Sequence, residues 1–424
     1  MRRLLPILVA VLLAYAGPVR ADDALAAEAD TRNDLLVKEG FNLTQRMTFS
    51  SSPRSVELLV APSHGDETTT VVLWFAAPEG EVSVRMTGPG GEAIAGWKGR
   101  SGEQRFVRAL APGKYVIEVG GAAGHGLIGV KGSVVGRCQV DASRLSEHAP
   151  ASGFSWPYLL LAPRSADATT LLVIPNNTGF LSEDLELLRA SATCELAGAV
   201  AMADRLGVAV LVPMFPRTPE VYTHALSRDA LTTKTPSVAR VDLQLIAMID
   251  HARSLLGKKI GPRVLMSGFS ASGSFTGRFA MLHPERVLAA AIGSPGGWPI
   301  APSTAWTYPV GIADVADLTG AKVDLGALRK VSLFLFMGDQ DANDSVPFRD
   351  SFTADDEALV MKAFGKTPVA RWDEARSLYE AAKLRATFKM YPGVAHEVSP
   401  EMARDVEAAF AAAMIHGAQS TSNH

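Results

Sequence analysis

The stretch Val264-Leu-Met-Ser-Gly-Phe-Ser-Ala-Ser-Gly273 joins a short apolar run to a segment with helical composition. This order is typical of a buried strand that turns sharply into a helix. A residue at the apex of such a turn needs small neighbours two positions before and after it, because larger side chains would collide with the folded backbone. Gly268 and Ser272 meet this need around Ser270. Ser270 is therefore a candidate nucleophile; the alternative is a Ser- and Gly-rich turn whose serines only cap the helix.

Continuously apolar runs alternate with helical patterns from about residue 155 onward. Runs that are apolar on both strand faces are typical of a parallel sheet covered by helices. We therefore predict a doubly wound, mostly parallel α/β domain over residues 141–424. The expected strands are 170–174, 208–212, 263–266, 287–292, 331–336 and 387–390, and the expected helices are 182–206, 237–256, 271–282 and 400–416.

Residues 41–140 have a different pattern, in which short alternating runs are separated by Gly- and Pro-containing turns. Strand-sized pieces at this spacing, without a convincing helix, predict a small all-β sandwich of immunoglobulin-like or jelly-roll type. The polar, Ala-rich leader at 22–40 fits either a helix or a disordered segment.

The N-terminus predicts an export signal over residues 1–21. Arg2 and Arg3 precede an apolar stretch of about a dozen residues, and Val19-Arg-Ala21 provides a cleavage site. A membrane anchor is the alternative, but the run is shorter than the ~20 residues that a span needs. We therefore expect an exported, periplasmic or secreted protein without a stable membrane anchor.

Composition excludes several classes of function. The net charge of -3 provides no basic field for nucleic-acid binding. No His, Cys or Asp spacing suits a metal, and no dinucleotide or phosphate-loop motif is found, so we expect no cofactor. The two cysteines, Cys138 and Cys194, are predicted to form a disulfide because export favours oxidation. Two buried thiols are the alternative.

The stretch around Ser270 resembles the nucleophile turn of the α/β-hydrolase superfamily, with a serine in place of the commonest second glycine. That superfamily has its acid after a late strand and its histidine after the last one. Gly338-Asp-Gln-Asp-Ala-Asn-Asp-Ser-Val-Pro347 is similar to its acid turn, and Pro392-Gly-Val-Ala-His-Glu397 to its histidine loop. The resemblance implies Asp341 as the orienting acid and His396 as the general base.

Two other carboxylates, Asp339 and Asp344, compete with Asp341 within one turn. Asp339 is close enough to the strand end to point elsewhere. Asp344, which is followed by Ser-Val-Pro, is better suited to an Asx turn. We therefore expect Asp341 to be the acid.

An oxyanion hole should accompany the triad. The amide of Ala271 is one expected donor, because it follows the nucleophile at a helix N-terminus. The second is expected from Asn177, in the loop after the first recognisable buried strand. The superfamily often has His-Gly-Gly there, whereas this chain has Asn-Asn-Thr, so an Asx turn that opens the next helix is the alternative.

Substrate specificity is expected in insertions that carry aromatic residues and could form an apolar acyl or aryl pocket. The alternative is a cap that packs on itself. The insertions are 215–235, 296–320 and 351–383, and the candidate pocket residues are Tyr222, Trp298 and Trp306.

Over residues 155–416 the chain resembles secreted serine esterases of the polyhydroxybutyrate-depolymerase and feruloyl-esterase kind. The resemblance implies an exported hydrolase that cleaves carboxylic esters in a small-molecule or polymeric substrate through an acyl-enzyme. Two alternatives remain: a serine peptidase or acyltransferase with the same triad, and a catalytically inactive hydrolase-fold protein whose β domain binds a polymer.

Overall fold

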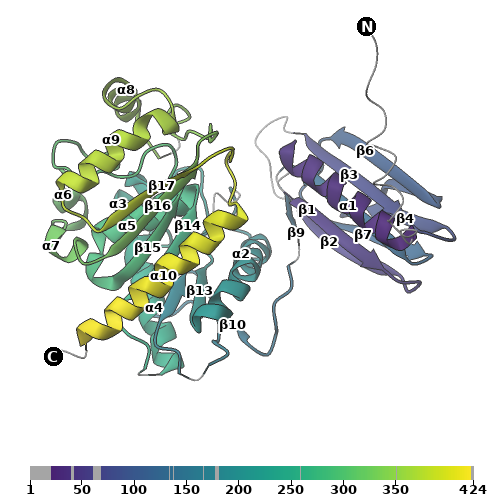
Figure 1. Ribbon diagram of the computed structural model, residues 1–424, viewed down its shortest axis with the longest axis horizontal. Coiled ribbons are helices and arrows are strands. Elements are labelled where there is room, and N and C mark those ends of the chain that lie inside the picture. Colours follow the sequence, from purple (N-terminus) through teal and green to yellow (C-terminus); the bar gives the residue numbers. More distant parts are fainter. Residues whose placement is uncertain are drawn as a thin grey trace, which may run out of the picture. The chain divides into compact units, whose positions relative to one another are not determined.

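The computed structural model describes residues 21–39, 43–60, 68–132, 134–136, 138–165, 167–176, 181–257, 259–349 and 351–421. Residues 1–20 of the predicted export signal lie outside these ranges. The chain divides into two compact units, Met1–Arg137 and Cys138–His424 (Figure 1). Among the described residues, none of the helices combines the length and hydrophobicity that a membrane crossing requires.

The N-terminal unit contains two antiparallel sheets, with strand orders β1-β8-β3-β6 and β5-β4-β7-β2-β9. Their facing side chains share one core, to which Phe75 contributes from one sheet and Ile117 from the other. This arrangement confirms the predicted all-β sandwich. The strands are β1 (Leu43–Phe49), β2 (Arg54–Val60), β3 (Thr69–Ala76), β4 (Val82–Thr87), β5 (Ala93–Gly99), β6 (Ser101–Arg108), β7 (Gly113–Gly121), β8 (Gly124–Lys131) and β9 (Val134–Gly136).

The leader forms helix α1 (Ala21–Lys38), which packs on the outside of this sandwich. The helix packs there because strand β3 is apolar on both faces and its outer face would otherwise be exposed. Leu73 belongs to the core between the sheets, whereas Trp74 points outward and is buried with Ala29 and Leu36 of the helix. The leader is thus a helix of the sandwich unit.

The C-terminal unit is built on an eight-stranded sheet with the order β10-β11-β13-β12-β14-β15-β16-β17. The six strands from β13 to β17 in this order are parallel, whereas β11 is antiparallel to both of its neighbours. The strands are β10 (Leu145–His148), β11 (Tyr158–Leu161), β12 (Leu171–Val173), β13 (Ala209–Pro213), β14 (Val264–Phe269), β15 (Val287–Gly293), β16 (Ser332–Gly338) and β17 (Ala386–Tyr391).

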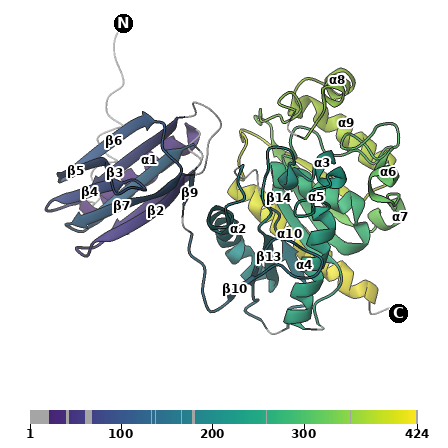
Figure 2. The same ribbon diagram turned by 180° about the vertical axis from the view of Figure 1, so that it is seen from behind.

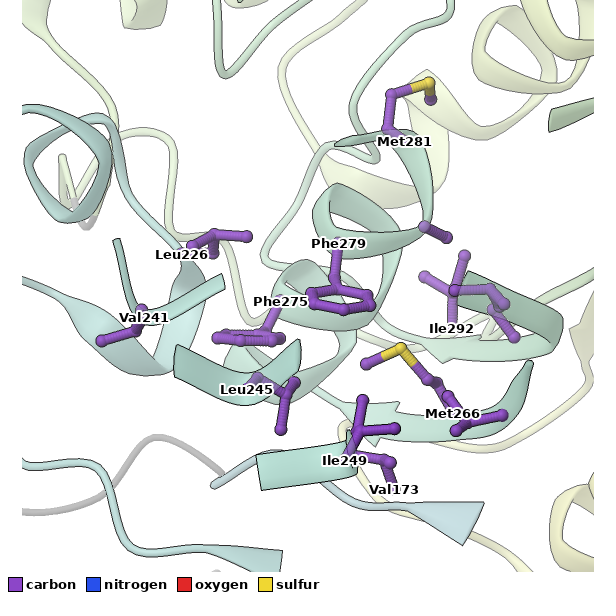
Figure 3. Close-up of a cluster of buried hydrophobic side chains, with 14 of the residues drawn as sticks. Val173, Leu226, Val241, Leu245, Ile249, Met266, Phe275, Phe279, Met281 and Ile292 are labelled. Atoms are coloured by element: carbon purple, nitrogen blue, oxygen red, sulfur yellow. The ribbon is translucent and has the colours of Figure 1, made fainter. Parts of the chain in front are cut away.

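Helices cover both faces of this sheet (Figure 2). Alternate strand residues enter separate cores, so that Met266 of β14 joins one and its neighbour Leu265 the other. Figure 3 shows the first core, where Phe275 and Phe279 approach Met266. Helices α4 (Val241–Leu256) and α5 (Ala271–Leu282) cover this face, and α2 (Leu185–Leu206) and α10 (Pro400–Thr421) cover the other. The predicted doubly wound sheet is confirmed.

The insertions contain shorter helices. The segment at 215–235 forms η1 (Thr223–Ala225) and α3 (Arg228–Thr232), and the segment at 351–383 forms α8 (Ala354–Ala363) and α9 (Pro368–Ala381). The segment at 296–320 has little regular structure before α6 (Val315–Thr319), which is followed by α7 (Leu325–Leu328).

Cys138 and Cys194 are joined by a disulfide with a Cα–Cα distance of 4.9 Å, which confirms the predicted bridge. It fastens the segment that precedes β10 to the middle of α2. The closed loop spans 56 residues, so its reduction should lower the free energy of unfolding by about 4 kcal/mol in the chain-entropy model. Calorimetry of wild type and of the Cys138→Ser/Cys194→Ser double variant tests this value. An unchanged unfolding temperature would contradict it.

Glu195, next to that bridge on α2, is expected to make the free energy of unfolding depend on pH. Its side chain borders an apolar hollow of about 290 Å³ together with Met202 and Phe269. Burial raises the pKa of Glu195 to about 7 from an ordinary value of 4.5. Between these pH values the unfolded chain releases its proton while the folded chain retains it, so unfolding free energy falls by up to about 3 kcal/mol as pH rises.

We therefore expect Glu195→Gln to raise the unfolding temperature at pH 8 and to leave it nearly unchanged at pH 4. Thermal denaturation at both pH values measures the difference. Glu374→Gln, at an exposed position of α9, should show no such pH dependence. Equal effects of Glu195→Gln at the two pH values would refute the assignment.

Candidate active site

Ser270 stands at the apex of the turn between β14 and α5, with φ of 60° and ψ of −124°. A residue other than glycine is strained in this backbone conformation, typically by about 1–3 kcal/mol, and such strain persists where function requires it. The tight backbone explains the small neighbours. A Cβ atom on Gly268 would lie 2.1 Å from the carbonyl oxygen of Ser272, and one on Gly273 would lie 2.2 Å from that of Gly293.

Ser272, which replaces the commonest second glycine, closes this turn. Its hydroxyl accepts a hydrogen bond from the Phe269 amide at 2.9 Å and donates one to the Phe269 carbonyl at 2.8 Å. A serine therefore fits the position sterically and also satisfies two backbone groups of the turn.

The three predicted triad residues meet at the carboxyl end of the sheet. The Nε2 atom of His396 lies 3.0 Å from Ser270 Oγ. Its Nδ1 atom lies 2.9 Å and 3.0 Å from the two carboxylate oxygens of Asp341. Asp341 follows β16 and His396 follows β17, so the parallel sheet brings together side chains that are 126 and 55 residues from the histidine. The three side chains are in hydrogen-bond contact in the order that a nucleophile, a base and an orienting acid would require.

The topology and this turn identify the architecture. The C-terminal unit has the α/β-hydrolase fold. Its parallel sheet carries the serine on a strand-to-helix elbow, and the chain order is serine, aspartate, histidine.

Comparisons with known proteins give structural matches alone. No protein-family model matches the chain, and no curated protein matches it. Among solved structures it is similar to poly(aspartic acid) hydrolase-1 from Sphingomonas sp. KT-1, with 20% identity, a TM-score of 0.45 and coverage of 62% of this chain and 96% of that chain. An S-formylglutathione hydrolase from Agrobacterium tumefaciens matches at 15% identity and a TM-score of 0.36, with coverage of 65% and 97%. A Pyrobaculum calidifontis esterase matches at 15% identity and a TM-score of 0.39, with coverage of 66% and 86%.

The C-terminal unit favours the ionised form of the Asp341 carboxyl. Asp341 is 3% exposed. Burial by itself would raise the pKa of Asp341, but the hydrogen bond with His396, the nearby hydroxyl of Ser294, the positive charge of His396 when it is protonated and the Asn343 amide together hold it below its usual range. A carboxylate in this state fixes the imidazole tautomer and stabilises the imidazolium when it forms.

The two competing carboxylates have other partners. Asp339 accepts a hydrogen bond from the Gly393 amide at 2.7 Å, which ties the acid turn to the histidine loop. Asp344 accepts one from the Val346 amide at 3.1 Å, as expected for an Asx turn. It also forms a buried ion pair with Arg371 of α9 at 2.8 Å. The sequence contains no signal for this pair, since its members lie 27 residues apart on different elements.

Of the two predicted oxyanion donors, Ala271 lies in the described part of the chain and Asn177 does not. Ala271 is the first residue of α5, directly after Ser270, so its amide lies at a helix N-terminus. Asn177 lies outside the described residues. Its neighbour Asn176 is buried, and the Asn176 side chain accepts a hydrogen bond from the Phe215 amide at 3.1 Å. This bond fixes the side chain of Asn176, the last described residue before position 177.

Of the predicted pocket residues, Trp298 belongs to the core of the cap and Trp306 packs against that core. Trp298 is 1% exposed, stacks on Phe364 with ring centroids 4.1 Å apart, and donates its indole N–H to Val310. Trp306 packs edge-on against the same phenylalanine. Trp298 is thus packed inside the cap, and the partly buried Trp306 contacts the same cap cluster. Aromatic burial serves a core as readily as a pocket.

The third pocket candidate, Tyr222, borders an open cleft of about 240 Å³ between cap segments, together with Pro309 and Phe352. The guanidinium of Arg217 lies 3.8 Å from the centre of its ring.

Arg278 is a residue that sequence reasoning missed. It extends from α5 and is 1% exposed. Its guanidinium donates to the Ala225 carbonyl at 2.7 Å and to Ser351 Oγ at 3.0 Å. It therefore fastens two cap segments to the helix that follows the nucleophile. Within the described ranges, no group of three or more His, Cys, Asp and Glu side chains is placed to hold a metal ion.

Proposed function

We propose that the protein is an exported serine hydrolase that cleaves carboxylic esters through an acyl-enzyme on Ser270. The observation that carries this proposal is the continuous contact from Asp341 through His396 to Ser270, at hydrogen-bond distances throughout. A serine hydroxyl is a weak nucleophile alone, and this geometry provides the base that activates it.

In the proposed first step, Ser270 Oγ attacks the ester carbonyl carbon while its proton passes to His396 Nε2. The carbonyl oxygen becomes an oxyanion, which the Ala271 amide would stabilise. The tetrahedral intermediate then expels the alcohol, which takes the proton from Nε2. An acyl-enzyme remains on Ser270.

In the second step, a water molecule gives its proton to His396 Nε2 and attacks the acyl carbonyl carbon. Collapse of the new intermediate breaks the bond to Ser270 Oγ, which regains the proton. The carboxylic acid leaves, and Asp341 stays ionised throughout because its pKa is held below the usual range.

Export is supported by two features. The N-terminal residues have the order of a signal peptide, and the Cys138–Cys194 bridge suits an oxidising compartment. Mass spectrometry of the protein secreted by its own cells tests this part, with a new N-terminus after Ala21 as the expected result.

The test of the activity is a panel of p-nitrophenyl esters of increasing acyl length, methyl ferulate and a polyhydroxybutyrate film, combined with a fluorophosphonate probe. We expect ester turnover and probe attachment to Ser270. Faster cleavage of aminoacyl anilides, or transfer to an added acyl acceptor in place of hydrolysis, would favour the peptidase or acyltransferase. Absence of both turnover and labelling would favour the inactive polymer-binding protein.

A further inference from the structure

Asn343 contacts both members of the Asp–His pair. It lies in the acid turn, two residues after Asp341, and its backbone amide donates to the Asp341 carboxylate at 2.9 Å. Its side-chain nitrogen Nδ2 lies 2.8 Å from His396 Nε2, the atom to which Ser270 Oγ approaches at 3.0 Å. The Asn343 side chain is exposed, so packing does not explain its position beside the imidazole.

The position of the hydrogen on the His396 ring determines which atom donates and which accepts in the contact with Asn343. Because His396 Nδ1 faces a carboxylate, it carries a hydrogen, and Nε2 of the neutral ring is then an acceptor. An amide N–H from Asn343 can donate to that lone pair only while Nε2 is unprotonated. A hydrogen bond that exists in one protonation state favours that state. The hydrogen bond from Asn343 therefore favours the neutral ring, whereas the negative charge of Asp341 favours the imidazolium.

We propose that Asn343 is a positioning residue that keeps His396 Nε2 unprotonated and directed at Ser270 between turnovers. The proposal rests on the proposed serine-hydrolase function and adds to it. When Nε2 takes the proton of Ser270, the Asn343 amide must release it, and the proton then passes to the leaving alcohol as before. The consequence is a base that stays ready for attack at lower pH than Asp341 alone would allow.

The surroundings of the ring leave few other candidates for this role. Within the described part of the chain, Ser270 and Asn343 are the hydrogen-bond partners of Nε2. The Phe269 ring packs against the imidazole, with centroids 4.8 Å apart. Besides Asp341, Asp339 bonds the Gly393 amide of the histidine loop, and Glu397 follows His396 in sequence.

The test is the pH dependence of kcat/KM for p-nitrophenyl butyrate in wild type, Asn343→Ala and Asn343→Asp. Loss of a bond made to one protonation state should move the acid limb of Asn343→Ala upward by about half to one pH unit. Its kcat on the plateau should rise by up to about tenfold, with KM unchanged, because the hydrogen bond that the Asn343 amide must release is absent from the ground state. Asn343→Asp places a carboxylate that holds the proton on Nε2, so its acid limb should move by more than about one unit.

Gln340→Ala is the matched control, because Gln340 is exposed in the same turn and should behave as wild type. An acid limb that stays in place in both Asn343 variants would overturn the proposal. A raised KM with an unchanged acid limb would assign Asn343 to substrate binding and would overturn it as well.

A second measurement separates this proposal from the proposed activity. The NMR titration of the imidazole Hε1 resonance, assigned with His396→Ala, needs no substrate. We expect the titration midpoint to rise in the order wild type, Asn343→Ala, Asn343→Asp. If wild type cleaves no ester and Ser270 is not labelled, the proposed activity fails, whereas an unchanged midpoint in both variants refutes the role of Asn343 whatever the activity.

Discussion

Replacement of Ser270 by alanine is expected to lower kcat by about five to six orders of magnitude, because it removes the atom that forms the acyl-enzyme. Covalent labelling by a fluorophosphonate should disappear as well. The unfolding temperature should change little, since the hydroxyl is not part of a core and alanine keeps the Cβ atom at the same backbone conformation. Initial rates, intact-protein mass after labelling and calorimetry measure these three quantities.

Ser272→Ala and Ser274→Ala are the controls, since both serines follow Ser270 on the same turn of helix. Ser272→Ala removes the two hydrogen bonds that close the elbow, so it should lower the free energy of unfolding by about 1–2 kcal/mol and keep the labelling. Loss of labelling in Ser272→Ala or Ser274→Ala, with a labelled Ser270→Ala, would show that the nucleophile is another serine.

Replacement of Asp341 by asparagine is expected to lower kcat by about four orders of magnitude, by analogy with other triads. The amide cannot stabilise the imidazolium, and its NH₂ group would favour the wrong tautomer of His396. KM should change much less, because the carboxylate is buried behind the histidine. Steady-state kinetics with a soluble ester measures both constants.

The two neighbouring carboxylates allow a matched comparison within one turn. Asp339→Asn should keep at least a tenth of the activity, because an amide oxygen can still accept from Gly393. Asp344→Asn should also keep at least a tenth when folded, but it leaves Arg371 buried without its ionic partner and should lower the free energy of unfolding by roughly 3 kcal/mol. An inactive Asp344→Asn beside an active Asp341→Asn would move the acid to Asp344.

The fold class and the elbow could be predicted from sequence because the forces behind them are local. The collision that forces a small residue at Gly268 involves the carbonyl of Ser272, four residues away. The apolar runs of the parallel strands reflect helices on both sheet faces, whichever helices these are. The bridge between Cys138 and Cys194 could be predicted from the expected export and from the presence of two cysteines.

The roles of the remaining site residues depended on tertiary structure, because they are set by segments that meet only after folding. Burial of an apolar ring is equally favourable in the core of a cap and in a substrate pocket, so the sequence around Trp298 could not distinguish these two environments. Asp344 acquired its ionic partner from α9, and Asn343 its contact from the loop after the last strand. In the sandwich, the sequence likewise could not show what covers Trp74, because α1 reaches this second apolar face of β3 only after folding. Local sequence patterns thus determined which helices and strands form, and the tertiary packing of distant segments decided which side chains come into contact.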